Sequence, residues 1–244
     1  MTNGYGQYCP LSLASELLSQ RWTLLVVSRL MAGGQRFNEL RRGLPQMSPT
    51  LLSKRLDQLE RAGIVSVQPR EKGRWREYSL TPAGVELKPL VDAMAVWGQR
   101  WARDMTLEDL DPAFLMWSMH TRVNTEALPP GRSVIEFSFS GAPIDCRSFW
   151  LVSEGDKVEM CLKDPGYGWD VKVRADLRVF IETWRGFRDF RSEIRAGRIR
   201  LSGPRELRKQ FPDWMALHVL AGIDREKPGR ERRLTRITGA RSRP

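Results

Sequence analysis

The sequence predicts an α+β protein of two domains followed by a short basic tail. Apolar residues recur at helical spacing up to residue 61, and period-two strands around a glycine turn follow. A polar stretch then interrupts the pattern at 103–112, and strands and helices resume beyond it. We therefore expect domains over 1–103 and 104–224. Residues 225–244 are basic and poor in apolar side chains, which predicts a disordered tail.

Charge is distributed unevenly along the chain. The formal net charge is +11, and residues 1–103 hold 15 Lys and Arg against 8 Asp and Glu, whereas residues 104–224 hold 17 against 19. A basic domain beside a nearly neutral one predicts a polyanionic partner for the first. The sequence shows no apolar run of membrane-spanning length, no secretory signal and only three scattered cysteines. These features favour a cytoplasmic protein without disulfides or a membrane partner.

The first domain is expected to open with three helices. Leucines at helical spacing predict one helix over 11–18, and an apolar run predicts a second over 21–32, which a glycine pair ends. A third helix of about two turns is expected from residue 36, because a glycine and a proline follow it closely.

The fourth helix is expected to be amphipathic. It follows a favourable N-cap, Ser48, and Gly63 closes it. Leu52, Leu56 and Leu59 share one face, which should be buried. The outer face and its flanks then carry Thr50, Ser53, Lys54, Arg55, Asp57 and Arg61.

A hairpin should follow, with strands at 64–70 and 74–80 around a glycine turn. Two helices joined by a short turn and followed by such a hairpin predict a winged helix-turn-helix, whose second helix enters the DNA major groove and whose wing approaches the backbone. Any single arginine here could equally be a solvated surface charge. The prediction therefore rests on the helices, the hairpin and their charged residues taken together. The expected DNA contacts are Arg36, Arg41, Arg42, Ser48, Thr50, Ser53, Lys54, Arg55, Arg70, Lys72, Arg74 and Arg76.

The last helix of the first domain is expected over 82–102. Thr81 caps it, and Pro89 should bend it near its start. Its apolar stripe could pack against its own domain or form an interface.

The segments "RWTLLVVSRL", "RFNELRRGLPQMSPTLLSKRLDQLERAG" and "YSLTPAG" resemble the HxlR-type winged-helix transcriptional regulators, over about residues 8–101. The resemblance implies a bacterial regulator that binds double-stranded DNA as a homodimer through the first and last helices of the domain. Cys9 matches a cysteine that senses oxidants or electrophiles in some members; the alternative is a small packing residue. The implied interface residues are Leu13, Leu17, Leu87, Leu90, Val91, Met94, Trp97 and Trp101.

The second domain is predicted to combine helices with a mainly antiparallel sheet. Its aromatic residues, among them Phe137, Phe180 and Trp184, could line a cavity for a small apolar ligand or fill a solid core. Residues 107–221, above all the run 170–211, resemble the sterol-carrier-protein-like fold, which implies a curved sheet with an apolar tunnel.

Catalysis is not expected. The two histidines, His120 and His218, have no neighbouring metal-ligand pattern, and no nucleophile elbow or phosphate loop is present, so we expect neither metal nor cofactor. The sequence predicts a DNA-binding repressor that occupies an operator and responds to a ligand or to thiol oxidation. The alternative is a lipid or metabolite carrier whose winged helix serves protein association.

Overall fold

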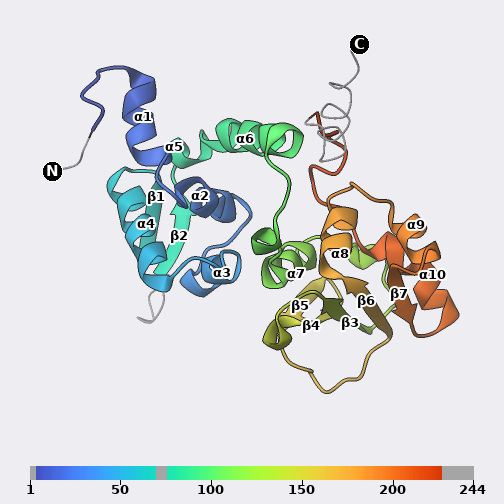
Figure 1. Ribbon diagram of the computed structural model, residues 1–244. Helices are drawn as coiled ribbons and strands as arrows, with labels where there is room; N and C mark the ends of the chain where they lie inside the picture. The colour runs from blue at the N-terminus through green and yellow to red at the C-terminus, as the bar shows by residue number, and fades with distance from the viewer. Residues whose placement is uncertain (1–3, 70–75, 227–244) are drawn as a thin grey trace, which may run out of the picture. The chain divides into compact units, whose positions relative to one another are not determined.

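The computed structural model describes residues 4–69 and 76–226, which form two compact units (Figure 1). One unit reaches to Met94 and the other begins at Ala95. The sequence placed this boundary after residue 103, in the polar stretch. The contacts place it earlier, within helix α6 (Lys88–Trp101), because the second half of that helix packs with the residues that follow it.

The first unit folds as the predicted succession of helices and a hairpin. Leu52, Leu56 and Leu59 are at most 1% exposed and share a core with the second helix and the hairpin. The two strands pair antiparallel, with Val67 opposite Tyr78. The elements are α1 (Pro10–Leu18), α2 (Thr23–Met31), α3 (Phe37–Arg42), α4 (Pro49–Arg61), β1 (Val65–Pro69), β2 (Arg76–Leu80) and α5 (Pro82–Val85).

Thr81 joins the end of α4 to the start of α5. Its hydroxyl lies 2.6 Å from the carbonyl oxygen of Gly63, to which it donates, and it accepts the N–H of Gly84 at 3.2 Å. The Cα of Gly84 packs so closely on the backbone that a Cβ there would lie 2.3 Å from the carbonyl oxygen of Ile64. This geometry explains the "TPAG" segment, because only glycine leaves room for that approach.

The predicted single helix over 82–102 is two helices, α5 and α6, and this part of the prediction was wrong. Pro89 lacks the N–H that would bond to the carbonyl of Val85, so α5 does not continue unbroken into α6. The sequence predicted a bend of one helix at Pro89. The structure instead has a break between α5 and α6, just before Pro89.

The second unit holds a five-stranded sheet in the order β5-β4-β3-β6-β7. Three of its four strand pairings are antiparallel, as predicted, and β3 pairs parallel to β6. Its strands are β3 (Arg132–Ser140), β4 (Ser148–Glu154), β5 (Lys157–Cys161), β6 (Val171–Asp176) and β7 (Ile199–Ser202). Its α-helices besides α6 are α7 (Pro112–His120), α8 (Leu177–Trp184), α9 (Phe190–Arg195) and α10 (Arg205–Trp214), with short 3-10 turns at Leu107–Asp109, Thr125–Ala127 and Ile144–Cys146.

Aromatic rings fill the space between this sheet and its helices. Phe137 and Phe139 of β3 lie 5.8 Å and 5.2 Å from the ring of Phe180 on α8, and Phe137 lies 6.3 Å from Phe211 on α10. Period-two alternation turns the intervening residues of β3 to the opposite face. The helices α8 and α10 therefore cover one face of the sheet (Figure 1).

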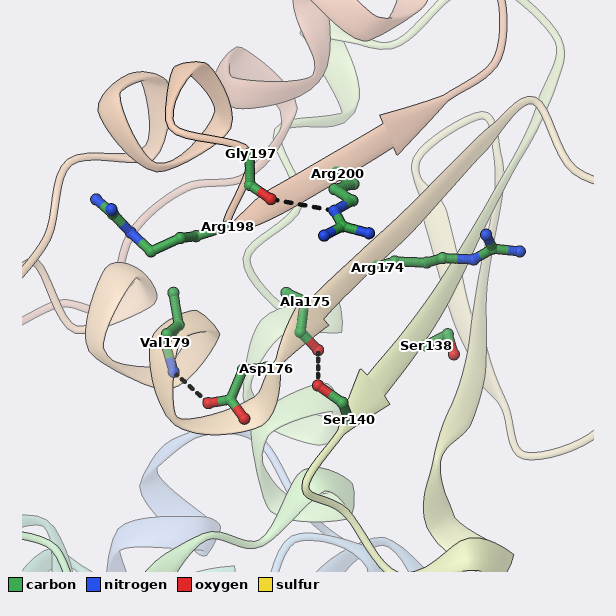
Figure 2. Close-up of a pocket in the computed structure, with 9 residues that line it drawn as sticks. All are labelled: Ser138, Ser140, Arg174, Ala175, Asp176, Val179, Gly197, Arg198 and Arg200. Atoms are coloured by element: carbon green, nitrogen blue, oxygen red, sulfur yellow. Dashed lines mark hydrogen bonds between the residues drawn. The ribbon is translucent and has the colours of Figure 1, made fainter.

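The other face carries an open polar hollow of about 450 Å³ (Figure 2). Ser138, Arg174 and Arg200 are direct neighbours across β3, β6 and β7. Arg200 donates from Nε to the carbonyl oxygen of Gly197 at 3.2 Å. The hollow thus takes in open-face residues of three strands and reaches Val179 of α8 at its edge.

Two residues of the predicted tail contact the second unit. Arg225 donates to Asp104 Oδ1 at 2.9 Å, and Glu226 accepts from Arg100 at 2.5 Å. The rest of the predicted disordered tail, 227–244, lies outside the described residues. Among the residues described, no helix is both long and apolar enough to cross a membrane.

Two glycine-to-alanine substitutions should have opposite effects on stability. Gly84→Ala forces a methyl group against the backbone of Ile64 and should lower the free energy of unfolding by about 1–3 kcal/mol. Gly98→Ala, inside α6 with open space around it, should raise it by roughly 0.5–1 kcal/mol through helix propensity. Chemical denaturation compares them, and equal stability of the two variants would contradict the close approach at Gly84.

Candidate nucleic-acid interface

Helix α4 presents the polar face that the sequence predicted. Ser48 caps it, with the Leu51 N–H donating to Ser48 Oγ at 3.3 Å, and Thr50, Ser53 and Lys54 are exposed in the first two turns. Farther along, the exposed face turns acidic at Asp57 and Glu60. Because phosphates repel carboxylates, this charge order favours entry of α4 into a groove by its N-terminal half.

Arg55 differs from its predicted role as a DNA contact. Its Nε donates to the carbonyl oxygen of Arg21 at 3.0 Å, and its Nη1 donates to Gln20 at 2.6 Å and also to Gln58. The side chain turns back along the flank of α4 toward the segment that precedes α2. These bonds engage Nε and Nη1 and hold the side chain against the segment before α2, so Arg55 helps to position α4.

Arginines at the N-cap of α3, at its last residue and on β2 surround a hollow of about 470 Å³. Arg36, Arg42 and Arg76 line it together, and Arg36 lies 4.0 Å from Glu77, a long and exposed ion pair. Arg41 is exposed on the same helix without lining the hollow. Three guanidinium groups around one open hollow can hold phosphate oxygens in bidentate geometry.

Four residues that line this hollow escaped the sequence reasoning: Phe37, Asn38, Glu39 and Tyr78. Burial raises the pKa of the Tyr78 phenol, while Arg76 opposes that shift. The only signal in the sequence was the alternation of strand 76–80, which indicates a buried Tyr78 and says nothing of α3. The predicted wing contacts Arg70, Lys72 and Arg74 lie outside the described residues.

Comparison with known proteins identifies the family. The model of the HxlR-like helix-turn-helix family matches residues 17–106. The uncharacterized HTH-type transcriptional regulator YvaP of Bacillus subtilis is 38% identical over 112 residues, which cover 45% of this chain and 95% of that protein. The chain belongs to the HxlR-like helix-turn-helix family. It is accordingly a DNA-binding protein of transcription regulation.

Two further proteins are similar to part of the chain. The uncharacterized regulator sll1512 of Synechocystis is 37% identical over 105 residues, which cover 42% of this chain and 77% of that protein. The solved structure of the reduced form of the regulator YodB from B. subtilis is 30% identical, with a TM-score of 0.36, and the match covers 41% of this chain and all of that one. The sterol-carrier-like resemblance of the second unit has no counterpart in these matches.

The HxlR-like domain exposes the apolar stripe expected at its last helix. On α6, Met94, Trp97 and Trp101 are 53%, 62% and 46% exposed, and Leu90 is exposed as well. Leu87 and Val91 instead pack partly against the core of their own unit. Packing within the unit therefore describes Leu87 and Val91, whereas an interface stays a prediction for the exposed residues.

Helix α1 has no buried residue. Leu13 is exposed and Leu17 is half-buried against the core. The sequence reasoning missed Tyr8 and Leu11, which are still more exposed than Leu13. Helix α1 and the residues just before it therefore leave several large apolar side chains exposed to water.

Cys9 stands at the N-cap of α1 and is exposed in the protomer. Hydrogen bonds from the backbone of Ser12 and Leu11 lower the pKa of its thiol, because they stabilise the thiolate. Burial raises the pKa of the other two cysteines, Cys146 and Cys161. The thiolate of Cys9 is therefore the most accessible nucleophile of the three.

Aromatic side chains fill the core of the second unit. The aromatic side chains of the sheet and helices contact one another, as a solid core requires. Cys, His, Asp and Glu side chains form no cluster of three or more able to hold a metal within the part of the chain described.

The lowered thiol pKa predicts an order of reaction. At pH values below the ordinary thiol pKa, iodoacetamide should label Cys9 faster than Cys146 or Cys161, because only Cys9 has an increased thiolate fraction there. Mass spectrometry of peptides after short exposures measures this order. Cys9→Ser should lose the fast phase and leave the slow labelling unchanged. Equal rates at all three sites would contradict an activated Cys9.

Proposed function

We propose that the protein is a sequence-specific repressor that binds operator DNA as a homodimer. The observation that carries the proposal is the exposed N-terminal half of α4, where Thr50, Ser53 and Lys54 face away from the buried leucines. Lysine can reach guanine acceptors, and hydroxyls can serve several bases. A dimer on an operator blocks access of other proteins to that DNA, which favours repression over activation.

The hollow between α3 and β2 would hold the phosphate backbone beside the groove. Its arginines are charged, exposed at their ends and set around one opening, which suits a phosphate rather than a base edge. Base contacts by α4 then determine which DNA sequence is bound. Phosphate contacts in the hollow determine the affinity for DNA and the register of the protein on it.

Two alanine variants separate these roles. Lys54→Ala should cost about 1–3 kcal/mol on the operator and less on random DNA. Arg76→Ala should weaken both duplexes by similar factors and lower the slope of log K against log salt by about one. Titration of each variant at several salt concentrations measures both quantities, once footprinting of bound DNA has identified the operator.

Matched controls lie in the second unit. Lys163→Ala and Arg205→Ala each remove one exposed positive charge there, and they should leave operator specificity unchanged. If Lys54→Ala binds the operator as wild type does, α4 does not read DNA in this orientation. If the intact protein binds neither duplex, the carrier alternative replaces the repressor.

The homodimer is proposed to form through α1 and α6. The exposed apolar side chains of both helices support it, because large apolar side chains gathered on a surface mark interaction sites. Alkylation of Cys9 by an electrophile would add bulk at the start of α1, within this interface, and would thereby connect thiol chemistry to DNA affinity.

Charge introduced into the stripe should break the dimer. Leu90→Glu combined with Met94→Glu places two carboxylates in the proposed apolar seam, and they would be costly to desolvate there. Both side chains are exposed in the protomer, so the variant should fold and sediment as a monomer. Ile144→Glu, an equally drastic change of an exposed apolar residue in the second unit, should remain dimeric. A dimer of unchanged affinity in the double variant would place the interface elsewhere.

We also propose a sterol-carrier-like fold for the second unit. The run from β6 through α8 and α9 to β7 has the order of strand, helix, glycine and strand that the resemblance implies. An apolar ligand inside its core has less support, because aromatic rings occupy that space.

A further inference from the structure

The second unit has a cavity of about 350 Å³ outside the space that the aromatic rings fill. The cavity lies between the end of α6, helices α7 and α8, and the segment after α10. Its wall is largely apolar, with Phe114, Leu115, Ile181, Trp184 and Leu220. Its size is at the lower end of the range of small-molecule sites.

One wall of the cavity carries an unsatisfied buried amide. Gln99 of α6 is 2% exposed, and its Nε2 has no hydrogen-bond partner among the described residues. Its Oε1 accepts from Arg185 Nη2 at 2.6 Å, which orients the amide so that the N–H groups remain as donors. A buried N–H group without an acceptor costs free energy, so a ligand with an acceptor atom at this position would be stabilised.

Arg185 lies beside this amide without a carboxylate partner. Its guanidinium is partly buried, stacks on the ring of Phe187 at 4.7 Å, and forms no ion pair with any described residue. Burial lowers the pKa of Arg185, and the nearby positive charge of Arg225 lowers it further. Arg225 has Asp104 as its own partner, so it offers Arg185 no compensation.

The carboxylates that line the cavity have other bonds. Asp109 pairs with Arg103 and accepts the Thr106 N–H at 2.7 Å, and these bonds hold the pKa of Asp109 far below its usual range. Asp111 accepts the Phe114 N–H at 2.9 Å as the N-cap of α7. The positive charge of Arg185 and the amide donor of Gln99 are thus left for a molecule from outside.

We propose that this cavity binds a small organic monocarboxylate, with its carboxylate on Gln99 and Arg185 and its aromatic or short aliphatic body against Trp184 and Ile181. A carboxylate offers two acceptor oxygens, which suit one amide donor and one guanidinium. Water alone would satisfy the amide but would leave the apolar wall wetted.

The polar hollow on the open face of the sheet is the rival site for an anion (Figure 2). Arg174 and Arg200 lie opposite each other there, but Arg174 is exposed to solvent. Water screens such charges and weakens an anion contact. Arg185 is less exposed and adjoins apolar side chains, which an organic anion requires and an inorganic one does not.

Gln99 lies on α6, the helix that also carries the exposed Trp97 and Trp101. A carboxylate bonded to Gln99 would favour one position of this helix and so act on the proposed dimer. This regulatory consequence rests on the proposed function, whereas occupancy of the cavity does not. If the ligand changes operator affinity by some factor, DNA must change ligand affinity by the same factor.

The experiment is calorimetric titration of the full-length protein without DNA. The probes are benzoate, phenylacetate, phenylbutyrate and octanoate, each beside its primary amide, at concentrations up to roughly 10 mM. At least one carboxylate should bind saturably with one site per chain. Its amide should bind roughly tenfold more weakly, since it lacks the charge-assisted bonds.

Three variants locate the binding. Gly98→Leu projects a side chain into the cavity from a position where a Cβ meets no atom within 4 Å, so it should abolish binding without harm to folding. Arg185→Gln should weaken binding by roughly tenfold or more. Arg174→Gln removes a guanidinium from the rival hollow and should leave binding unchanged.

Each outcome decides the matter. The proposal is wrong if no carboxylate binds wild type, if the amide binds equally well, or if Gly98→Leu still binds. Loss of binding in Arg174→Gln alone would move the anion to the hollow of Figure 2. Failure of the protein to bind DNA, with carboxylate binding intact, would overturn the proposed function and leave the cavity standing.

Discussion

The burial of three leucines on α4 determines which face of this helix points away from the core of the DNA-binding unit. Because Leu52, Leu56 and Leu59 are almost wholly removed from water, rotation of the helix by even one residue would expose apolar surface and bury charge. The outward direction of Thr50, Ser53 and Lys54 is therefore a consequence of the core. The bonds of Arg55 to the segment before α2 and of Thr81 to the end of α4 hold the same orientation from two sides.

Local patterns were enough to predict much of this fold. Helical spacing, the caps at Ser48 and Thr81, and period-two strands depend on neighbours a few residues apart, and the structure confirms them. Contacts between distant segments could not be predicted in this way. Arg55 donates a hydrogen bond to Gln20, 35 positions away, and Arg185 donates one to Gln99, 86 positions away. Sequence periodicity does not predict such long-range hydrogen bonds. For the same reason the grouping of Asn38 with Tyr78 emerged only from the fold.

The second unit separates two environments that its composition could not distinguish. Its aromatic residues were compatible with a lined cavity or a filled core, and their rings contact one another between sheet and helices. Two of its hollows lie elsewhere, one on the open face of the sheet and one at the end of α6. Their chemistry follows from which side chains lack partners, as with the amide of Gln99, rather than from hydrophobicity.

Helix α6 belongs to both units, since the division falls between Met94 and Ala95. A fragment cut at that point would retain only about two turns of the helix, and so short a helix is marginal in water without its neighbours. Dissection of the protein should therefore keep Lys88–Trp101 whole, whichever half is studied. Because α6 contributes residues to both units, unfolding of the helix in one unit removes packing surface from the other. The two units should therefore unfold cooperatively rather than independently.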